Sequence, residues 1–337
     1  MAEPVKVVLS GGPPGKKAEA IHQLRAEANA KGYALLLLPG AEALLEKGGV
    51  LLTAGTSQRD LASIALRLQL ELERSFLQAA QLMAADKVLL LYEHGALDIG
   101  ARVPDREFTQ VLREMDLSLL ELRDRYDGVF LLDPSDTRRA AAWTGHPHVR
   151  MLDGGAGIDP QRLSAELTIL LGDPRPVEIE RKFLVEPDPS WLEDLSPSRS
   201  VSITQVYLNA PPGEEIRIRR RSADGASLYY QTTKRSLTGM KRIEVERRIS
   251  EAEYHALLAD ADPSRHPIQK TRTYFLYQNQ YFELDTYPFW TDRAILEIEL
   301  SSETESVRVP ERCRVIREVT GDPNYKNAAL SKLELQE

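Results

Sequence analysis

Two patterns of hydrophobic and polar residues divide the chain near its middle. In the first half, short apolar runs alternate with longer stretches of helical periodicity. Continuous apolar strands separated by helices are typical of a parallel sheet covered by helices on both faces. We therefore predict an α/β, doubly wound domain over residues 1–172. Its expected strands are Val5–Ser10, Tyr33–Leu38, Lys87–Tyr92 and Tyr126–Leu132, and its expected helices are Ala18–Lys31, Arg59–Ala84 and Gln161–Leu171.

The second half shortens its period to two residues, which is the period of a strand. A Pro-rich stretch at residues 173–176 reads as a linker, and a second domain is expected over residues 177–337. After a first strand near residue 180, strand signals recur at 202–209, 214–222, 227–234, 242–249, 268–275, 280–287, 293–301 and 314–319, with one helical insert at Glu251–Leu258. Eight strands close a small barrel with room for a ligand. We predict an α+β domain built on an eight-stranded antiparallel barrel that forms a tunnel.

Nearly every predicted strand of this domain has one charged face and one apolar face. The positions that share a charged or polar face within a strand are Glu178, Glu180 and Lys182; Arg217 and Arg219; Thr232 and Lys234; Glu244 and Glu246; Lys270 and Arg272; Glu283 and Asp285; and Glu297 and Glu299. For the first strand alone, a solvated salt bridge explains the pattern equally well. For the whole set, charges of both signs inside a barrel cost several kcal/mol each unless they are paired. The pattern therefore favours a polyanionic ligand bound together with metal ions.

Composition narrows the classes of partner. The chain has 337 residues and a net charge of −8, and neither half is basic, so nucleic acid is not an expected partner. No apolar run reaches the length of about 20 residues that spans a bilayer. The N-terminus reads as a buried strand and not as a signal peptide. A single cysteine, Cys313, fits a reducing compartment, so we predict a cytoplasmic protein and leave its oligomeric state open.

The first domain carries a glycine-rich turn, Gly11–Lys17, between its first strand and first helix. This is the context in which a phosphate-binding loop occurs. The turn departs from G-x-x-x-x-G-K-[ST] because Ser10 stands at the first glycine and Lys17 replaces the hydroxyl that ligates Mg²⁺. The third strand ends in Glu93-His94-Gly95.

Two further stretches, Leu97-Asp98 and Trp143–Arg150, resemble AAA-type P-loop ATPase domains. The resemblance implies a degenerate P-loop NTPase-like domain that does not turn over ATP, with at most a residual nucleotide site at Gly15 and Lys16. His146 and His148 are expected to cap the sheet and not to bind a metal.

The second half resembles the CYTH family of triphosphate tunnel metalloenzymes. The matching motifs are Glu178-x-Glu180-x-Lys182, Arg217-Ile218-Arg219, Thr232-Thr233-Lys234, Glu244-Val245-Glu246, Lys270-Thr271-Arg272, Glu283-Leu284-Asp285, Glu297-Ile298-Glu299 and Glu318–Asp322. They occur in order and cover about residues 177–330. The resemblance implies an eight-stranded antiparallel tunnel that binds a triphosphate and a divalent metal.

Roles follow from the resemblance and from the chemistry of each side chain. Arginine grips phosphate oxygens in bidentate fashion and lysine acts as a point charge, and carboxylates suit Mg²⁺ or Mn²⁺. Expected triphosphate-binding residues are Lys182, Arg217, Arg219, Lys234, Lys270 and Arg272. Expected metal ligands are Glu178, Glu180 and Glu299, with Asp285 and Glu297 as further candidates. Expected catalytic residues are Glu178, Glu180, Lys182, Glu244 and Glu246, although Glu244 and Glu246 fit equally well as partners that hold Arg217 and Arg219.

Three functions remain open at this point. The leading hypothesis is metal-dependent hydrolysis of inorganic tripolyphosphate or of an organic triphosphate. The alternatives are a class IV-type adenylate cyclase and a polyphosphate-sensing module without turnover. Phe289 and Trp290 would stack a base at the tunnel mouth or plug the barrel.

Overall fold

The structure is a computed structural model that describes residues 3–50, 57–133, 135–152, 160–171, 179–186, 190–191, 195, 197–236, 242–300 and 304–332. The chain divides into two compact units, Met1–Gly172 and Asp173–Glu337. No described helix is long and apolar enough to cross a membrane.

The first unit is built on a parallel sheet, as predicted. Its strands lie in the order β2-β3-β1-β4-β5, and every ladder between them is parallel. The strands are β1 (Val5–Ser10), β2 (Ala34–Leu38), β3 (Val88–Tyr92), β4 (Gly128–Leu131) and β5 (Val149–Met151). The helices are α1 (Pro14–Ala30), α2 (Ala41–Lys47), α3 (Gln58–Leu82), α4 (Ala96–Gly100), α5 (Asp105–Glu114), α6 (Leu119–Arg123), α7 (Thr137–Trp143) and α8 (Pro160–Leu171). The short β5 was not predicted, because three residues are too few to show a period.

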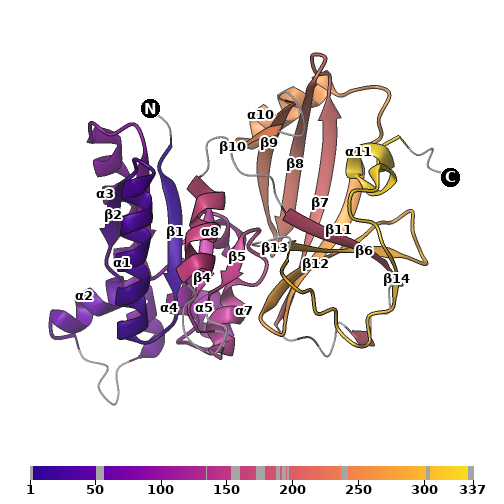
Figure 1. Cartoon of the computed structure of the whole chain (residues 1–337). Helices are drawn as coiled ribbons and strands as arrows, with labels where there is room; N and C mark the ends of the chain where they lie inside the picture. The colour runs from indigo at the N-terminus through magenta and orange to yellow at the C-terminus, as the bar shows by residue number, and fades with distance from the viewer. Residues whose placement is uncertain are drawn as a thin grey trace. The chain divides into compact units, whose positions relative to one another are not determined.

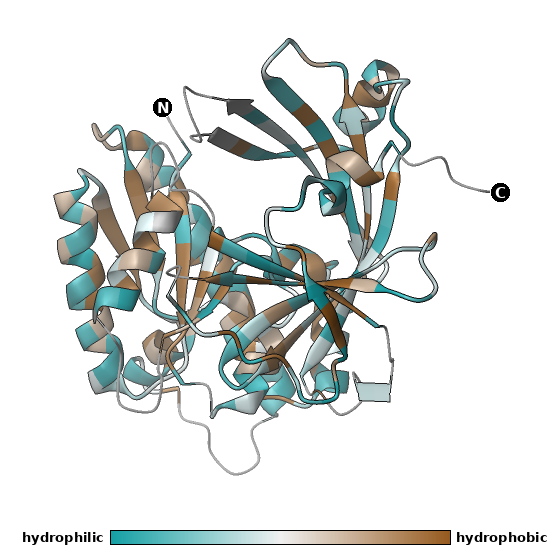
Figure 2. Ribbon diagram, turned by 45° about the vertical axis from the view of Figure 1, so that its right-hand side comes forward, coloured by the Kyte–Doolittle hydropathy of each residue, from teal (hydrophilic) through white to brown (hydrophobic). Residues whose placement is uncertain are grey.

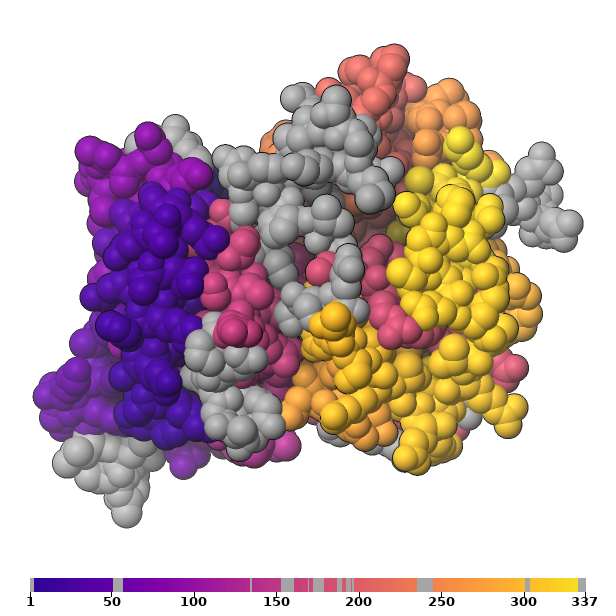
Figure 3. Space-filling view, viewed as in Figure 1, coloured from indigo at the N-terminus to yellow at the C-terminus, as the bar shows by residue number. Residues whose placement is uncertain are grey.

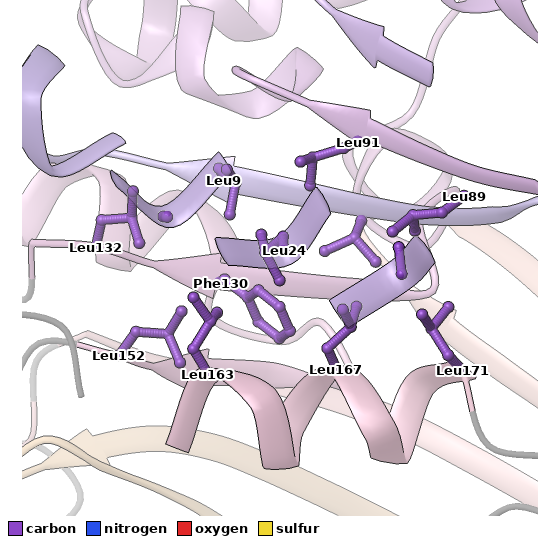
Figure 4. Close-up of a cluster of buried hydrophobic side chains, with 13 residues drawn as sticks. Leu9, Leu24, Leu89, Leu91, Phe130, Leu132, Leu152, Leu163, Leu167 and Leu171 are labelled. Atoms are coloured by element: carbon purple, nitrogen blue, oxygen red, sulfur yellow. The ribbon is translucent and has the colours of Figure 1, made fainter. Parts of the chain in front are cut away.

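Leucines of α1 and α8 cover one face of this sheet. Leu24 of α1 and Leu163 and Leu167 of α8 pack on Leu9 and Phe130, and none of the five side chains reaches solvent (Figure 4). Figure 2 shows the strands of this unit largely in brown, between helices that also carry teal. Full burial of each such side chain is worth about 1.5–3 kcal/mol. The continuous apolar runs of the first half therefore form the core that the pattern predicts.

The second unit is an antiparallel sheet. Its strands lie in the order β10-β9-β8-β7-β11-β12-β13-β6-β14. They are β6 (Ile179–Val185), β7 (Ser198–Leu208), β8 (Glu214–Ala223), β9 (Ala226–Ser236), β10 (Arg242–Ile249), β11 (Ile268–Tyr277), β12 (Gln280–Thr286), β13 (Ala294–Leu300) and β14 (Val315–Glu318). In Figure 1, β7 and β8 run nearly upright whereas β6 runs nearly across the view, so the sheet is strongly twisted.

The predicted closed eight-stranded barrel is not what the described residues form. They make a nine-stranded sheet with β10 at one edge and β14 at the other, and no ladder joins these two strands within the described part of the chain. The ninth strand is short: β14 adds to β6 with a register shift between Val315 and Arg317, and all four of its residues are exposed. An exposed strand of four residues buries too little apolar surface to complete a barrel wall.

The two faces of the sheet differ as the alternation predicts. One face carries Phe183, Phe275, Phe282 and Leu296, which pack together in one buried cluster. A second buried cluster joins the same side of β8 and β9 to helix α10 (Glu251–Leu257), where the rings of Tyr254 and Tyr229 lie 4.9 Å apart. The predicted helical insert is confirmed. The opposite face carries the charged residues.

The C-terminal segment covers one end of the charged face. Helix α11 (Asn327–Leu330) places Leu330 against Ile268, Tyr287 and Ile295, and these four residues form a buried cluster. Phe289 and Trp290 pack against this cluster, each with its ring about 5 Å from that of Tyr287. Figure 3 shows the yellow C-terminal residues as a continuous part of the surface of this unit. This packing favours the plug over the base-stacking role for Phe289 and Trp290.

Candidate active site

Four neighbouring strands place charged residues opposite one another on the charged face. Glu299 of β13 lies opposite Glu180 of β6, and Glu297 lies opposite Lys182. On the next ladders Glu283 lies opposite Glu297, and Asp285 lies opposite Arg272. Side chains directly opposite in an antiparallel pair have Cβ atoms about 4.5–5.5 Å apart. The register therefore gathers charges of both signs into one contiguous site.

Arg272 is the centre of this cluster. Its Nε donates to Asp285 Oδ1 at 2.7 Å and its Nη2 donates to Asp285 Oδ2 at 2.6 Å, which makes a bidentate pair. The same guanidinium donates to Glu297 Oε2 at 2.9 Å and to Glu283. With its side chain only 12% exposed, Arg272 is fixed in one orientation.

Asp285 is fully buried between two cations. Lys270 donates to its Oδ2 at 2.5 Å, the same oxygen that accepts from Arg272 Nη2. Burial alone would raise the pKa of Asp285, but Arg272 and Lys270 hold that pKa below its usual range. Both carboxylate oxygens are engaged, so in this arrangement Asp285 positions Arg272 and Lys270 and does not face an open coordination site.

Lys182 bridges two carboxylates. Its Nζ lies 2.9 Å from Glu297 Oε1 and 3.1 Å from Glu180 Oε2. Burial works to lower the pKa of Lys182, but the charges of Glu297 and Glu180 outweigh it and raise the pKa above the ordinary value. Lys182 is therefore a permanent cation at neutral pH, held between the Arg272 cluster and the edge of the site.

Glu180 and Glu299 are the expected metal ligands that the structure describes, and both are half-buried. They are cross-strand neighbours on the charged face, and the Glu180 side chain is 37% exposed. Carboxylate oxygens are the donors that Mg²⁺ and Mn²⁺ prefer, and Mg²⁺ keeps several waters beside one or two protein carboxylates. Glu178 lies outside the described residues, and within the described ones no set of three such donors converges. The chemistry of these donors fits a divalent ion. Two of the three expected ligands, Glu180 and Glu299, lie in the described part of the chain.

A second group of site residues lies on β8, β9 and β10. Arg219 Nη2 donates to both carboxylate oxygens of Glu246, at 2.8 and 2.9 Å, and Thr232 Oγ1 donates to Glu246 Oε2 at 2.8 Å. Of the two roles expected for Glu246, this geometry favours the one that holds an arginine. Arg217 lies opposite Tyr207 on β7 and hydrogen-bonds to it.

Lys234 and Glu244 lie opposite each other at the outer edge of the sheet. The Glu244 side chain is outside the described part of the structure, so its expected catalytic role stays a prediction. Lys234 is half-buried on the same face as Thr232.

Two residues of the site had been given no role in the prediction from the sequence. Glu283 is a full member of the Arg272 cluster, and burial raises its pKa to about 7 although Arg272 acts in the opposite direction. Arg221 is a third arginine on the face of Arg217 and Arg219, and its Nη2 donates to the Tyr274 hydroxyl at 3.3 Å. The alternation rule finds Arg221, because it follows Arg219 by two residues.

In the first unit, the lysine that reaches across the carboxyl end of the sheet is Lys17. Its Nζ donates to the Glu93 carbonyl at 2.5 Å and lies 3.2 Å from His94 Nε2, while Lys16 is half-buried at the start of α1. Counted from Gly11 instead of Ser10, the motif spacing puts Lys17 at the lysine position. In that register Lys16 replaces the second glycine and Ala18 replaces the hydroxyl. The Mg²⁺-binding hydroxyl is therefore missing in either register, and Gly15 and Lys16 stay a predicted site only.

The two stretches predicted to be ATPase-like contact each other inside the first unit. Trp143 Nε1 lies 3.1 Å from both Asp98 Oδ1 and Ser10 Oγ, and the Ser10 hydroxyl donates to Asp98. Asp98 has no exposed surface, and it also accepts from the Gly95 amide at 2.8 Å. The hydrogen bonds between these side chains join β1, α4 and α7.

His146 is occupied by backbone on both ring nitrogens. Its Nδ1 accepts from the His148 amide at 2.9 Å, and its Nε2 lies 3.0 Å from the Tyr126 carbonyl. Its surroundings agree with the expected capping role.

Lys17 is expected to titrate well below an ordinary lysine. Burial disfavours its ammonium form and lowers the pKa of Lys17 to about 8, since the nearby charge of Asp98 opposes burial only in part. Nitrogen-15 NMR of lysine-labelled full-length protein measures this, with Lys17→Met identifying the Nζ resonance. A midpoint above 10 would show that the amine is solvated and not held against Glu93 and His94.

Comparisons with known proteins find a family and relatives that match the second unit. The CYTH domain family model matches residues 177–314. An inorganic triphosphatase of Acetivibrio thermocellus is 31% identical over 156 residues, which cover 46% of this chain and 93% of that protein. The chain belongs to the CYTH domain family.

Solved structures overlap the same half of the chain. The crystal structure of an inorganic triphosphatase is 30% identical, with 48% of this chain and 98% of that one covered, at a TM-score of 0.35. A protein of Pyrococcus horikoshii is 17% identical, with coverage of 37% and 80% and a TM-score of 0.29. The predicted CYTH domain is confirmed over the matched residues, whereas the ATPase-like origin of the first unit stays a prediction.

Proposed function

We propose that this protein hydrolyses a triphosphate on the charged face of its CYTH domain, in a reaction that requires a divalent metal. The observation that carries the proposal is the single polar cluster in which Lys182, Lys270 and Arg272 are held by carboxylates from three strands. The similarity to an inorganic triphosphatase over nearly its whole length supports it. We take inorganic tripolyphosphate as the first substrate to test, with organic triphosphates next.

The cations of the face would bind the phosphate chain. Arg219 and Arg217 stand on β8 with Lys234 beside them on β9, and Lys182, Lys270 and Arg272 stand on β6 and β11. Arginine matches phosphate oxygens in bidentate geometry, and each buried contact is strengthened by the low local dielectric. Glu246 and Asp285 preset the orientation of Arg219 and Arg272, so less conformational entropy is lost when the substrate binds.

Glu180 and Glu299, together with Glu178, would hold Mg²⁺ or Mn²⁺. When bound, such an ion neutralises phosphate oxygens and lowers the pKa of a coordinated water. The residues around it supply position and charge: Lys182 is fixed beside Glu180 and Glu297, and Arg272 is fixed one strand further on. In this proposal Glu297 and Asp285 hold cations and do not bind the metal. Charge stabilisation at the transferred phosphoryl group is the main source of rate.

The first unit, residues 1–172, would be a degenerate P-loop-like domain joined through residues 173–176 to the CYTH domain at 177–337. The lack of a hydroxyl at the Mg²⁺-binding position supports this assignment, as does the internal use of Lys17 and Asp98. Any nucleotide bound near Gly15 and Lys16 would not be turned over. We also propose that the protein acts in the cytoplasm, in keeping with its single cysteine.

The test is a substrate panel with the full-length chain. Tripolyphosphate, ATP and pyrophosphate are offered with Mg²⁺ or Mn²⁺, and released phosphate and cyclic AMP are both measured. Release of phosphate from tripolyphosphate that stops on chelation supports the proposal, and Lys16→Ala should leave the rate unchanged. Cyclic AMP as the product would identify a cyclase, and tight tripolyphosphate binding without turnover would identify a sensor.

A further inference from the structure

A buried layer of side chains lies at one end of the charged face. Arg221 is 1% exposed and its guanidinium lies 5.9 Å from the centre of the Tyr274 ring, whose hydroxyl it also contacts at 3.3 Å. Tyr274 is 2% exposed and stacks on Tyr281, with ring centroids 5.7 Å apart and 23° between the planes. This layer extends across β12, β11, β7 and β8, because Arg221 reaches over β7 to meet Tyr274.

Apolar residues complete the layer. Val201, Ile203 and Leu228 occupy the same face at this end, and each is at most 2% exposed. Arg221 and Leu228 lie near the turn that joins β8 to β9, and Tyr274 and Tyr281 lie near the turn that joins β11 to β12. Ile203 lies opposite Arg221 and Lys270. Further along the same face, the side chains of Arg219 and Glu246 are 18% and 25% exposed. On β8, the exposure of the arginines therefore falls sharply from Arg219 to Arg221, two residues further along the strand.

The opposite end of the face is also filled. Tyr207 is 3% exposed and lies under the guanidinium of Arg265, 4.7 Å from the ring centre. Beside it, Ile268 and Tyr287 are buried beneath Leu330 of α11. The accessible part of the face is thus bounded at both ends of the strands by side chains that have no free surface.

We propose that Arg221, Tyr274 and Tyr281 form an end wall that limits the chain length of the phosphate substrate. The inference rests on the proposed function, since it concerns the selectivity of that same site. Residues two apart on a strand are about 7 Å apart, so Arg217 and Arg219 bracket a short phosphate chain. A longer polyphosphate must continue past Arg219, where it meets the end wall.

The end wall excludes longer polyphosphate chains because it fills the space, and not because it repels their charge. Arg221 is a cation and would attract a further phosphate if it were accessible, but the residue is 1% exposed and its guanidinium is directed at the ring and hydroxyl of Tyr274. Removing its side chain leaves space beside Tyr274, whereas a methionine of similar length keeps the space filled. Comparing Arg221→Ala with Arg221→Met therefore separates volume from charge.

The experiment compares tripolyphosphate, tetrapolyphosphate and long-chain polyphosphate as substrates for the full-length protein. We expect kcat/KM of the wild type to fall by at least about tenfold beyond tripolyphosphate. Arg221→Ala and Tyr274→Leu should raise the ratio of long-chain to tripolyphosphate activity, mainly through KM, and Arg221→Met should keep the wild-type ratio. Arg220→Ala is the matched control, because Arg220 is exposed on the other face of β8. Tyr281→Leu provides a further variant if one of these does not fold.

The outcomes separate this inference from the function on which it rests. Equal wild-type activity on all chain lengths, or folded variants that keep the wild-type ratio, would overturn the end wall but leave the triphosphatase intact. Absence of hydrolysis of every phosphate chain would overturn both.

Discussion

Glu180→Gln should abolish triphosphate hydrolysis and leave the fold intact. The Glu180 side chain is 37% exposed, and its partner Lys182 is also held by Glu297, so the strand does not need Glu180 for packing. Glutamine has the same shape but offers one neutral oxygen in place of two charged ones, and a hard divalent cation binds it weakly. We expect kcat/KM to fall by at least about 100-fold, and excess metal to restore only part of the loss. Steady-state phosphate release over a Mg²⁺ and Mn²⁺ titration measures this, with circular dichroism as the check on folding.

Glu318→Gln is the matched control for that substitution. Glu318 lies on the adjacent strand β14, where it accepts two hydrogen bonds from Arg181 on the outer side of β6. It therefore has the same chemistry on a neighbouring strand but lies on the other face, opposite Phe183, and its loss should leave turnover unchanged. Activity of Glu180→Gln close to that of Glu318→Gln would remove Glu180 from the metal site.

Alternation of charged and apolar residues identified the face on which each site residue lies. Strand geometry explains this success, because side chains two apart share a face whatever the rest of the fold does. Glu180, Lys182, Arg219, Arg272 and Glu297 all occur on one face with apolar residues behind them. The same rule, carried two residues further, would also have found Arg221.

Alternation does not reveal which charges meet. The pairing of Arg272 with Asp285, Glu283 and Glu297 depends on the register between β11, β12 and β13. Long-range contacts set this register. Asp285 and Glu297 therefore stayed further candidates for metal ligands after Glu299, although the structure engages both with cations. The closure of the barrel could not be predicted for the same reason, because it depends on how the first and last strands pair.

Motif spacing was ambiguous in the first unit. Two consecutive lysines, Lys16 and Lys17, allow two registers of the phosphate-loop pattern, and only the direction of each side chain distinguishes them. The structure directs Lys17 toward the end of β3. The buried contact of Asp98 with Trp143 joins residues 45 positions apart, and no local pattern predicts it.

Arg272→Ala is expected to cost both activity and stability. The substitution leaves Asp285, Glu283 and Glu297 facing one another with one cation fewer, and breaking a buried ion pair from one side costs about 3–5 kcal/mol. Triphosphate hydrolysis should be lost as well, because the same guanidinium is proposed to bind phosphate. Urea denaturation of the full-length protein measures the stability, and phosphate release measures the activity. Arg247→Ala is the control: its partners Gln231 and Glu253 are at the surface, where such pairs contribute about 0–1 kcal/mol.

The pH dependence of the Arg272→Ala deficit tests its electrostatic origin. Arg272 and Lys270 hold the pKa of Asp285 below its usual range, against the effect of burial. A carboxyl with a lowered folded-state pKa stabilises the protein above its unfolded pKa, which is about 3.9, and this contribution is lost as the pH falls through the folded value. The deficit of Arg272→Ala relative to wild type should therefore narrow as the pH falls, because without Arg272 the carboxyls of the folded variant accept protons at a higher pH than those of the wild type. A deficit that does not change with pH would assign the loss to the packing of the arginine side chain, and Arg272→Lys, which restores the charge without the planar fork, should then recover little stability.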